Sequence, residues 1–563
     1  MKKLKPDYDV IIVGSGAGAG PVIYELSRSG FRVLVLEKGP WYRTAEFRKD
    51  ELVATRRDVY TPNLKDEFHV LSFEDETGTP VSRSTFEMGW SFWNGNMVGG
   101  SSNLMSGYFQ RMKPVDFRLL STYGEIPGAN VVDWPIGYED LEPYYTRVET
   151  AVGISGRVVD HRFQEPRSTP QFPYPPLKEN IVSQFIDRAA VQLGYEVIPT
   201  PRAILSRDEA DRKACYYSNY CGSYGCASDA KGSSRVAFIR DALKTGNLTV
   251  VTNAHVFFLE TDGNYKLKAA RFITPDGKTH RIEGKIFVVA AQAVESIRLL
   301  LLSKNPEFHN GLANNNGLVG KNILFSSGGI GSGDFYLDEY DEETARAIMQ
   351  PGVFVNRTLQ SFYELEDPGN GHKIKGGLVD FLFEHANPVP KAIKQKWDGD
   401  RLLFGAELKQ RIKHYFTRVR KLKFEIFTDW LPHDGSFVRL SDRKDYRGFP
   451  VADIHINGHP AQLKPARIIA RKTEALFREM GLKNIQSFVD HTPPSNLQAG
   501  GIRFGNDPRT SVLNKWCQAH EVENLFVTDG SFMPTGGSVP YTWTIYANSF
   551  RVADYIKKEF KPS

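Results

Sequence analysis

A glycine-rich turn near the start of the chain has the residue types that bind a dinucleotide. It reads Gly14-Ser15-Gly16-Ala17-Gly18-Ala19, and Glu37 follows about 20 residues later. Gly14 permits a tight turn, Gly16 lets a pyrophosphate approach the backbone, and the small Ala19 lets a helix pack closely on a strand. The Glu37 carboxylate can accept hydrogen bonds from ribose hydroxyls. These residues predict a nucleotide site and leave both nicotinamide and flavin cofactors open.

Three cysteines stand close together further along the chain. Cys215, Cys221 and Cys226 have the spacing C-x5-C-x4-C, which is too irregular for a zinc ribbon and one thiolate short of a four-cysteine site. Three thiolates can still hold an iron–sulfur cluster with one corner empty. The alternative is a set of buried thiols, or one disulfide with a spare cysteine. Cys517 lies far from this group and is expected to be a small core residue.

The elements that position the glycine turn can be recognised from hydrophobic patterns. Residues 9–13 (DVIIV) and 33–37 (VLVLE) predict buried strands, and residues 21–30 (PVIYELSRSG) have helical spacing and end on glycine. The turn then lies at the helix N-terminus, whose unpaired N–H groups face phosphates. The sequence therefore predicts a strand–helix–strand unit within a mixed α/β chain.

Length and composition are those of an ordinary packed protein. Of the 563 residues, 41% are hydrophobic and 24% charged, and the net charge is +5. These values exclude a disordered or fibrous chain and give no support to nucleic-acid binding. The start, MKKLKPDYDV, has no apolar run before the first strand, so we expect no secretory signal of its own. No segment is long and apolar enough to span a bilayer, so membrane contact is expected only through partners.

Several further segments resemble the glucose–methanol–choline (GMC) oxidoreductase family. Within that family they look most similar to the flavoprotein large subunits of bacterial gluconate, glucose, fructose and glucoside dehydrogenases. The segments are residues 93–110 (WNGNMVGGSSNLMSGYFQ), 133–149 (DWPIGYEDLEPYYTRVE), 288–303 (VVAAQAVESIRLLLLS) and 525–554, which begin LFVTDGSFMPTGG. The resemblance implies FAD as the cofactor and oxidation of a hydroxyl group in a sugar, glycoside or sugar acid. It also implies a Rossmann-like FAD-binding domain of GMC type and a sheet-and-helix substrate domain.

The resemblance also assigns contacts to FAD position by position. It places three residues in the loop over the isoalloxazine, one at a backbone contact to adenine, and two where the chain returns to the phosphates and ribityl chain: Gly99, Gly100 and Ser101; Val256; Asp529 and Gly530. The two glycines carry no side chain that would keep the backbone away from a flat ring. Several relatives have a histidine where this chain has Leu104, so histidyl attachment of FAD is not expected.

The positions of the flavin motifs divide the chain into interleaved segments. The predicted FAD-binding domain comprises residues 1–120, 221–330 and 491–563, and the predicted substrate domain comprises residues 121–220 and 331–490, with a cysteine-rich segment at 215–226. Residues 423–430 (KFEIFTDW) and 436–442 (SFVRLSD) have strand character and are expected to supply a sheet that roofs the flavin. Residues 407–423 predict a basic helix with one apolar face. It either covers a core or serves as a docking surface for an acidic or membrane-bound partner.

The cysteine segment extends the resemblance. Together with residues 229–234 (DAKGSS) it resembles the iron–sulfur segment of those large subunits. The resemblance implies a 3Fe-4S cluster on Cys215, Cys221 and Cys226, with Ser218 in the slot that such a cluster can spare. It also implies a cytochrome c subunit as electron acceptor and a small subunit that carries an export signal. Periplasmic location by co-export and cytoplasmic location are both compatible with the bare N-terminus.

The proton-handling pair of the family is missing. Oxidation of an alcohol by a flavin requires a base that takes the hydroxyl proton, but Leu497 and Pro540 occupy the slots of the family's histidine and its partner. In a first interpretation another base, His491, Tyr541 or Tyr546, serves the oxidation of a sugar or related alcohol. In a second, the flavin carries out a different redox reaction. In a third, the chain is a non-catalytic electron-carrying or structural subunit.

Overall fold

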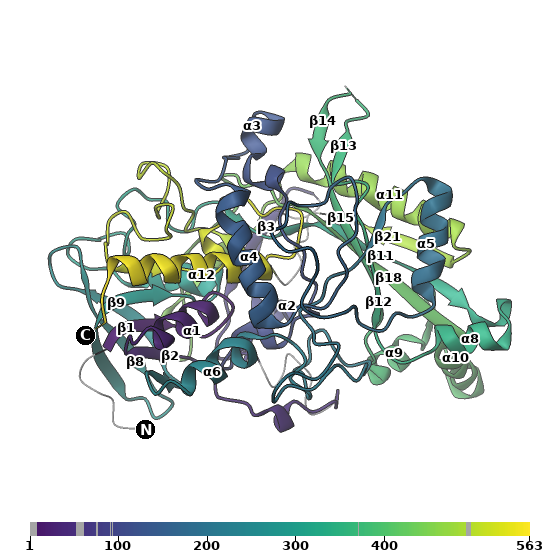
Figure 1. Cartoon of the computed structure of the whole chain (residues 1–563), viewed down its shortest axis with the longest axis horizontal. Coiled ribbons are helices and arrows are strands. Elements are labelled where there is room, and N and C mark those ends of the chain that lie inside the picture. The colour runs from purple at the N-terminus through teal and green to yellow at the C-terminus, as the bar shows by residue number, and fades with distance from the viewer. Residues whose placement is uncertain are drawn as a thin grey trace.

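The computed structural model describes residues 8–51, 61–74, 77–90, 92, 94–369, 371–490 and 497–562. Two large β-sheets organise the chain, and they lie on opposite sides of Figure 1. None of the described helices combines the length and the apolarity that a membrane crossing requires.

The first sheet contains the predicted strand–helix–strand unit. Strand β1 (Tyr8–Val13) pairs in parallel with β2 (Val33–Leu36), and helix α1 (Gly20–Arg28) connects them, which confirms the local prediction. The strand order is β6-β2-β1-β9-β8-β7, and β23 also pairs with β9. These further strands are β6 (Leu248–Val251), β7 (His255–Thr261), β8 (Leu267–Ile273), β9 (Thr279–Val289) and β23 (Leu525–Val527).

Helices cover the parallel part of this sheet. The C-terminal helix α12 (Thr542–Glu559) packs against both α1 and α4 (Tyr138–Val152), as the yellow, purple and blue ribbons of Figure 1 show. Helix α7 (Ala293–Leu302) follows β9 and begins beside the glycine turn that follows β1. Because α12 comes from the last residues of the chain, the dinucleotide fold is complete only when both chain ends have come together.

The second sheet has six strands in the order β21-β11-β18-β15-β12-β5. Its strands are β5 (Val197–Pro199), β11 (Ser326–Tyr336), β12 (Phe354–Leu359), β15 (Gly377–Phe383), β18 (Val419–Asp429) and β21 (Lys483–Phe488). One face packs against α5 (Val182–Leu193) and α11 (Leu463–Glu479) around a core that includes Phe381 and Phe424. Side chains alternate along a strand, so the neighbouring residues face the opposite side of the sheet.

A third sheet of four strands joins segments from the two predicted domains. Strand β3 (Val70–Glu74) pairs with β4 (Pro80–Ser84) on one side and with β20 (Pro450–His455) on the other, and β20 pairs with β19 (Phe437–Lys444). The first two belong to the predicted FAD-binding segments and the last two to the predicted substrate segments. Strand β11 also crosses the expected boundary at residue 330. Whether the two parts fold as separate domains stays a prediction.

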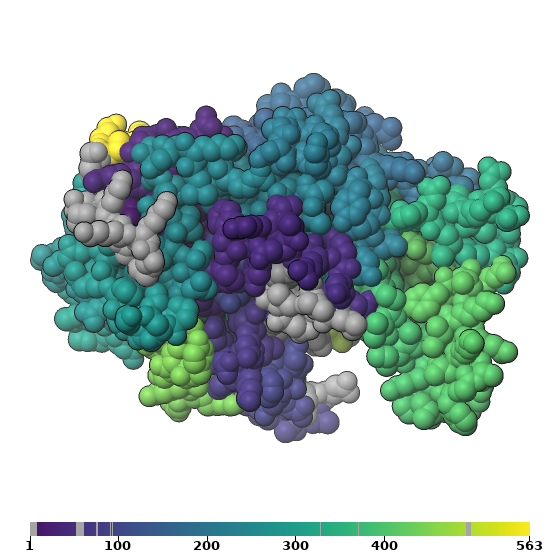
Figure 2. Space-filling model, turned by 90° about the horizontal axis from the view of Figure 1, so that it is seen from below, coloured from purple at the N-terminus to yellow at the C-terminus, as the bar shows by residue number. Residues whose placement is uncertain are grey.

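The predicted helix at 407–423 ends earlier than expected. Helix α10 spans Gly405–Arg418, and β18 begins at Val419, so the last part of the predicted helix is strand. Its apolar face is half-buried, whereas Lys409 and Lys413 are exposed. With α9 (Pro388–Lys394), α10 belongs to the green lobe at the lower right of Figure 2, which a hollow separates from the purple N-terminal part. The docking role of this helix stays a prediction.

Candidate functional site

A cavity of about 510 Å³ is bounded by residues of both large sheets. This volume is in the range of ligand and cofactor pockets, about 300–1,000 Å³. The wall is built from segments far apart in the sequence: residues 13–18, 36–38, 100–108, 254–256, 290–293, 382–385, 423–427, 497–498, 529–530 and 540–542. One end is formed by the glycine turn and the other by the six-stranded sheet.

The glycine turn approaches its neighbours so closely that side chains are excluded. Gly14 has a φ of +88°, and a Cβ there would lie 2.4 Å from the carbonyl oxygen of Ala290. A Cβ on Gly18 would lie 2.6 Å from the backbone nitrogen of Asp529. A Cβ on Gly16, in contrast, would meet no described atom within 4 Å, because Gly16 faces the cavity. Free space at this glycine, at the helix N-terminus, fits a bound pyrophosphate.

Glu37 closes the nucleotide end of the cavity. Its carboxylate accepts hydrogen bonds from Ser15 Oγ at 2.5 Å and from the Gly39 backbone N–H at 2.8 Å. Ser15 Oγ in turn accepts from the Gly99 N–H at 2.9 Å, which ties the flavin loop to the turn. Burial raises the pKa of Glu37, although these hydrogen bonds oppose the shift. The side chain lines the cavity, where a ribose hydroxyl can donate to it.

Most of the predicted cofactor contacts meet at this cavity. Gly14, Gly16, Glu37, Gly100, Ser101, Val256, Asp529 and Gly530 line its wall. Two of the predicted residues stand behind the wall: Ala19 is fully buried directly before α1, and Gly99 has a φ of +90° and turns the loop. Their expected roles are therefore in packing and in the turn. Eight of the ten predicted residues thus line the cavity, and their contacts with FAD stay a prediction.

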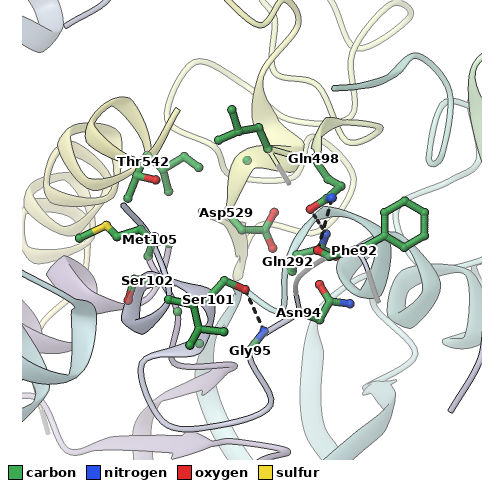
Figure 3. A pocket seen from close by; sticks show the side chains of 18 of the residues that line it. Phe92, Asn94, Gly95, Ser101, Ser102, Met105, Gln292, Gln498, Asp529 and Thr542 are labelled. Atoms are coloured by element: carbon green, nitrogen blue, oxygen red, sulfur yellow. Dashed lines mark hydrogen bonds between the residues drawn. The ribbon is translucent and has the colours of Figure 1, made fainter. Parts of the chain in front are cut away.

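Asp529 occupies the middle of the close-up in Figure 3, between the loop of Ser101 and Met105 and the side chain of Gln292. It accepts hydrogen bonds from Ser296 Oγ and from the Ser531 backbone N–H. Burial raises its pKa, and the hydrogen bonds from serine lower it. These bonds fix the carboxylate at the point where the chain returns to the cavity.

Buried polar groups in this wall lack protein partners. Asn94 and Asn96 line the cavity, and within the described residues no group donates to the buried Oδ1 atom of either side chain. An unpaired buried acceptor costs about 1–3 kcal/mol, so a bound ligand with donor groups stabilises this arrangement. Together with the open face of Gly16, these acceptors fit the polar groups of FAD, which would occupy this end of the cavity.

The six-stranded sheet forms the opposite wall. Lys423, Glu425 and Phe427 alternate along β18 and line the cavity, as expected for a strand that roofs the flavin. Glu384 and His385, which follow β15, also line it. Sequence reasoning predicted strand character at 423–430 but did not identify these four ionisable residues. The alternation of charged and apolar residues in KFEIF was the available signal.

Both slots of the missing proton-handling pair border this cavity. Leu497 lines it and has a φ of +60°, a left-handed conformation that is uncommon for a residue other than glycine. Pro540 lines it as well. Two side chains without ionisable groups therefore lie where the resemblance expects a proton acceptor. Leu104 is also part of the wall and offers no atom for a covalent link to FAD.

The three proposed bases lie in different places. Tyr541 lines the cavity, but its hydroxyl donates to the Phe325 carbonyl at 2.6 Å, and burial raises its pKa well above the ordinary value. Tyr546 is fully buried outside the lining residues, and burial raises its pKa. His491 lies outside the described residues. Of the two candidates that the structure describes, Tyr541 alone lines the cavity.

The cysteines gather on a small hydrophobic cluster. Cys221 is buried in it, and Cys215 and Cys226 pack against it as free thiols. Burial raises the pKa of Cys215 to about 12, whereas the effect of burial on Cys226 is outweighed by the charge of Lys231, which lowers the pKa of that thiol. In the part of the chain that the structure describes, no three His, Cys, Asp or Glu side chains are arranged to hold a metal ion. The predicted cluster ligands are near one another but do not form a metal site.

Comparison with known proteins matches this architecture. Two family models, both described as GMC oxidoreductase, match residues 77–325 and 432–549. The 2-methyl-1,2-propanediol dehydrogenase of Mycolicibacterium austroafricanum is 29% identical, with 98% of this chain and 95% of the relative covered. The fructose dehydrogenase large subunit of Gluconobacter japonicus is 28% identical, with 98% of both chains covered. The paromamine 6'-oxidase of Streptomyces fradiae is 27% identical, with 98% and 91% covered.

Solved structures share the fold. A formate oxidase from Aspergillus oryzae has a TM-score of 0.64 at 14% identity, with 99% of both chains covered. A pyridoxine 4-oxidase has a TM-score of 0.62 at 16% identity, with 98% of this chain and all of that chain covered. The matched segments contain the flavin loop and the chain return at Asp529, and the cavity they form fits FAD. The chain belongs to the GMC oxidoreductase family and is an FAD-dependent oxidoreductase.

Proposed function

We propose that this chain is a dehydrogenase for a hydroxyl group of a small polar molecule, such as a sugar, a glycoside, a sugar acid or a short diol. The carrying observation is the charged wall at the end of the cavity away from the glycine turn, where Lys423, Glu425 and Glu384 face the space for substrate. A polar substrate can replace the water lost by these groups, whereas an alkyl chain cannot. The wall therefore favours a polyhydroxy compound over a long-chain alcohol.

The two ends of the cavity have different tasks in this proposal. The glycine turn, Glu37 and Asp529 hold the nucleotide, and FAD, when bound, supplies a two-electron acceptor for the hydrogen on the substrate carbon. The six-stranded sheet positions the substrate and excludes bulk water from the reacting groups. Gln498, whose amide accepts a 2.7 Å hydrogen bond from Gln292, orients polar groups between the two ends.

Anaerobic flavin bleaching tests the proposal. The purified holoenzyme is mixed with D-fructose, gluconate, 2-methyl-1,2-propanediol, paromamine and a long-chain alcohol, and the flavin absorbance is followed. The four polar compounds correspond to names of relatives of the chain. We expect reduction by at least one of them and slower reduction by the long-chain alcohol. Bleaching by none of the alcohols would overturn the proposal and favour a different redox reaction or a non-catalytic role.

The route of the electrons beyond FAD is a second part of the proposal. The sequence points to a 3Fe-4S cluster on Cys215, Cys221 and Cys226, and to a cytochrome c subunit as acceptor. Two observations favour electron transfer from FAD through the cysteine segment. Gly222 and Ser223 of this segment line the cavity, and the Ser223 N–H donates to the Leu104 carbonyl of the flavin loop at 2.6 Å. Against a cluster stands the lack of a metal-binding group among the described residues.

Iron and acid-labile sulfide analysis of the purified protein tests this second part. Stoichiometric iron and sulfide would support the cluster, and a flavin spectrum without iron would overturn it. The proposed location, in the periplasm with a small signal-bearing subunit or in the cytoplasm, is tested by fractionation of cells that express the chain with and without the neighbouring subunits.

A further inference from the structure

Two carboxylates lie next to each other on the cavity face of the six-stranded sheet. Asp380 on β15 and Glu425 on β18 are direct partners in the antiparallel register. Such partners have Cβ atoms about 4.5–5.5 Å apart and point to the same face. Their neighbours Phe381 and Phe424 belong to the core on the other face, and Glu425 lines the cavity. One member of the pair, Glu425, therefore lies in the cavity wall, and the other, Asp380, lies beside it in the interior.

Asp380 is the buried member of the pair. It is fully buried and accepts hydrogen bonds from Thr358 Oγ1 at 2.5 Å and from Gln110 Nε2 at 3.0 Å. Burial raises its pKa to about 7; Thr358 and the charge of Arg202 oppose this shift, and the charge of Glu425 adds to it. The like charge of Glu425 beside it therefore favours the protonated form of Asp380.

Glu425 differs from the other carboxylates that line the cavity. Each of the others accepts a hydrogen bond from protein groups: Glu37 from Ser15 and Gly39, Glu295 from His69, Glu384 from Tyr415, and Asp529 from Ser296 and Ser531. Within the described residues no group donates a hydrogen bond to Glu425 or forms an ion pair with it. Its oxygens are available to a molecule in the cavity.

The surroundings favour a proton acceptor over a site for a cation. Lys423 stands two residues away on the same face of β18 and lines the same cavity, so a positively charged ligand would be repelled. Leu497 and Pro540 on the facing wall carry no ionisable group, and the Tyr541 hydroxyl already donates to a carbonyl. Tyr108 and Arg202 are further ionisable groups beside the pair among the described residues.

We propose that Glu425 is the catalytic base of the oxidation and that Asp380 is its positioning residue. In this step the substrate O–H bond breaks and its proton passes to the Glu425 carboxylate. With FAD bound, the hydrogen on the same carbon would leave with both bonding electrons to the flavin, and the carbon–oxygen double bond would form. Asp380 lies opposite Glu425 in the strand register and presents its own charge to the base. The inference rests on the proposed alcohol oxidation and assigns its missing base.

Rapid-mixing measurements of flavin reduction test the catalytic role. The substrate is the panel alcohol that bleaches the wild-type flavin fastest, and the variants are Glu425→Gln and Glu425→Asp, with Glu366→Gln on the distant strand β13 (Glu364–Glu366) as a matched control. We expect Glu425→Gln to lower the limiting rate by about 10²–10⁴-fold with little change in substrate affinity, and Glu425→Asp to restore part of it. An unchanged limiting rate, or a loss confined to substrate affinity, would overturn the assignment.

A second measurement examines the pair without relying on turnover. The infrared band of protonated carboxyl groups is recorded on the holoenzyme between about pH 5 and about pH 9. We expect a component that disappears near neutral pH, is absent in Asp380→Asn, and shifts to lower pH in Glu425→Gln because the neighbouring charge is lost. The pH profile of the flavin-reduction rate in Asp380→Asn should also differ from that of wild type, because the titrating Asp380 carboxyl is gone. A band unchanged by Glu425→Gln would overturn the pairing.

The two measurements separate this inference from the function on which it rests. A wild-type flavin that no panel alcohol bleaches would overturn the oxidation, and the base role with it, while the infrared titration would still report the carboxyl pair. If the flavin of Glu425→Gln is bleached as fast as the wild-type flavin, the base role alone would be overturned.

Discussion

The nucleotide end and the substrate end of the cavity are built by different means. At the nucleotide end the backbone dominates: Gly14 and Gly18 leave no room for a Cβ, and Gly16 leaves its space to the ligand. At the substrate end side chains dominate, with Asp380 and Glu425 brought together by the pairing of β15 and β18. A site built by close approach of the backbone accepts only glycine at its contact positions. A site built by side chains can change its reactive groups while the same strands stay paired.

This difference explains how the chain can keep FAD and lack the expected proton-handling pair. Leu497 and Pro540 border the cavity but contribute nothing to the glycine turn, which depends on Gly14 and Ala290. Substitution at the substrate end therefore leaves cofactor binding intact. The predictions below test whether the two ends are as independent as this contrast implies.

The largest effect is expected from Gly14→Ala. The new Cβ would lie 2.4 Å from the Ala290 carbonyl oxygen, and the φ of +88° is strained for alanine. We expect a variant that purifies without flavin and unfolds at a lower temperature. The matched variant is Gly16→Ala, whose Cβ enters open space. It should keep the melting temperature of the apoprotein and lose FAD affinity. Stoichiometric FAD in Gly14→Ala would contradict the backbone argument.

At the substrate end, Asp380→Asn should change how stability depends on pH. The folded pKa of Asp380, about 7, lies above the unfolded value of about 3.9, so the folded state binds more protons between these values. The stabilisation of the folded state by proton binding at Asp380 is fully present below about pH 4 and is lost as the pH rises to about 7. As the pH rises from 5 to 8, the unfolding free energy of Asp380→Asn should therefore increase by about 2–3 kcal/mol relative to that of wild type.

Denaturant unfolding at several pH values measures this gain, and Asp400→Asn serves as the control because Asp400 is exposed. A pH-independent difference between Asp380→Asn and wild type would contradict a folded pKa of about 7 for the buried carboxyl. FAD content should be the same in both proteins, because the change lies at the substrate end.

The difference between the nucleotide end and the substrate end also determines how much of the fold and of the site could be predicted from the sequence. Residues 9–13, 21–30 and 33–37 gave the correct strand–helix–strand unit, because each pattern is local and glycine fixes the turn. Strand character was predicted for residues 423–430 of β18, but the first residues of this strand were assigned to the preceding helix, since VRKLK fits both periods. The partnership of Asp380 with Glu425 depends on register between distant strands, which no local pattern encodes.

A smaller effect is expected from Glu37→Gln. The amide keeps the shape of the side chain but loses the charge that strengthens hydrogen bonds from Ser15 and from a ribose hydroxyl. We expect FAD affinity to fall by about 1–2 kcal/mol, or roughly tenfold. Titration of the apoprotein with FAD, followed by flavin fluorescence, measures the change. An equal loss in limiting reduction rate would show that the two ends are coupled.

The smallest effect should come from Tyr541→Phe, which removes a hydroxyl at the border between the two ends. That hydroxyl donates to the Phe325 carbonyl, and the raised pKa of Tyr541 keeps the phenol protonated at neutral pH. Its loss leaves a buried carbonyl unpaired and costs about 1–3 kcal/mol of stability, while the limiting rate of flavin reduction should fall less than about tenfold. Tyr546→Phe, away from the lining residues, provides the comparison. A loss of the size expected for Glu425→Gln, seen in Tyr541→Phe alone, would transfer the proton-accepting role to Tyr541, because a structural defect would lower stability without abolishing reduction.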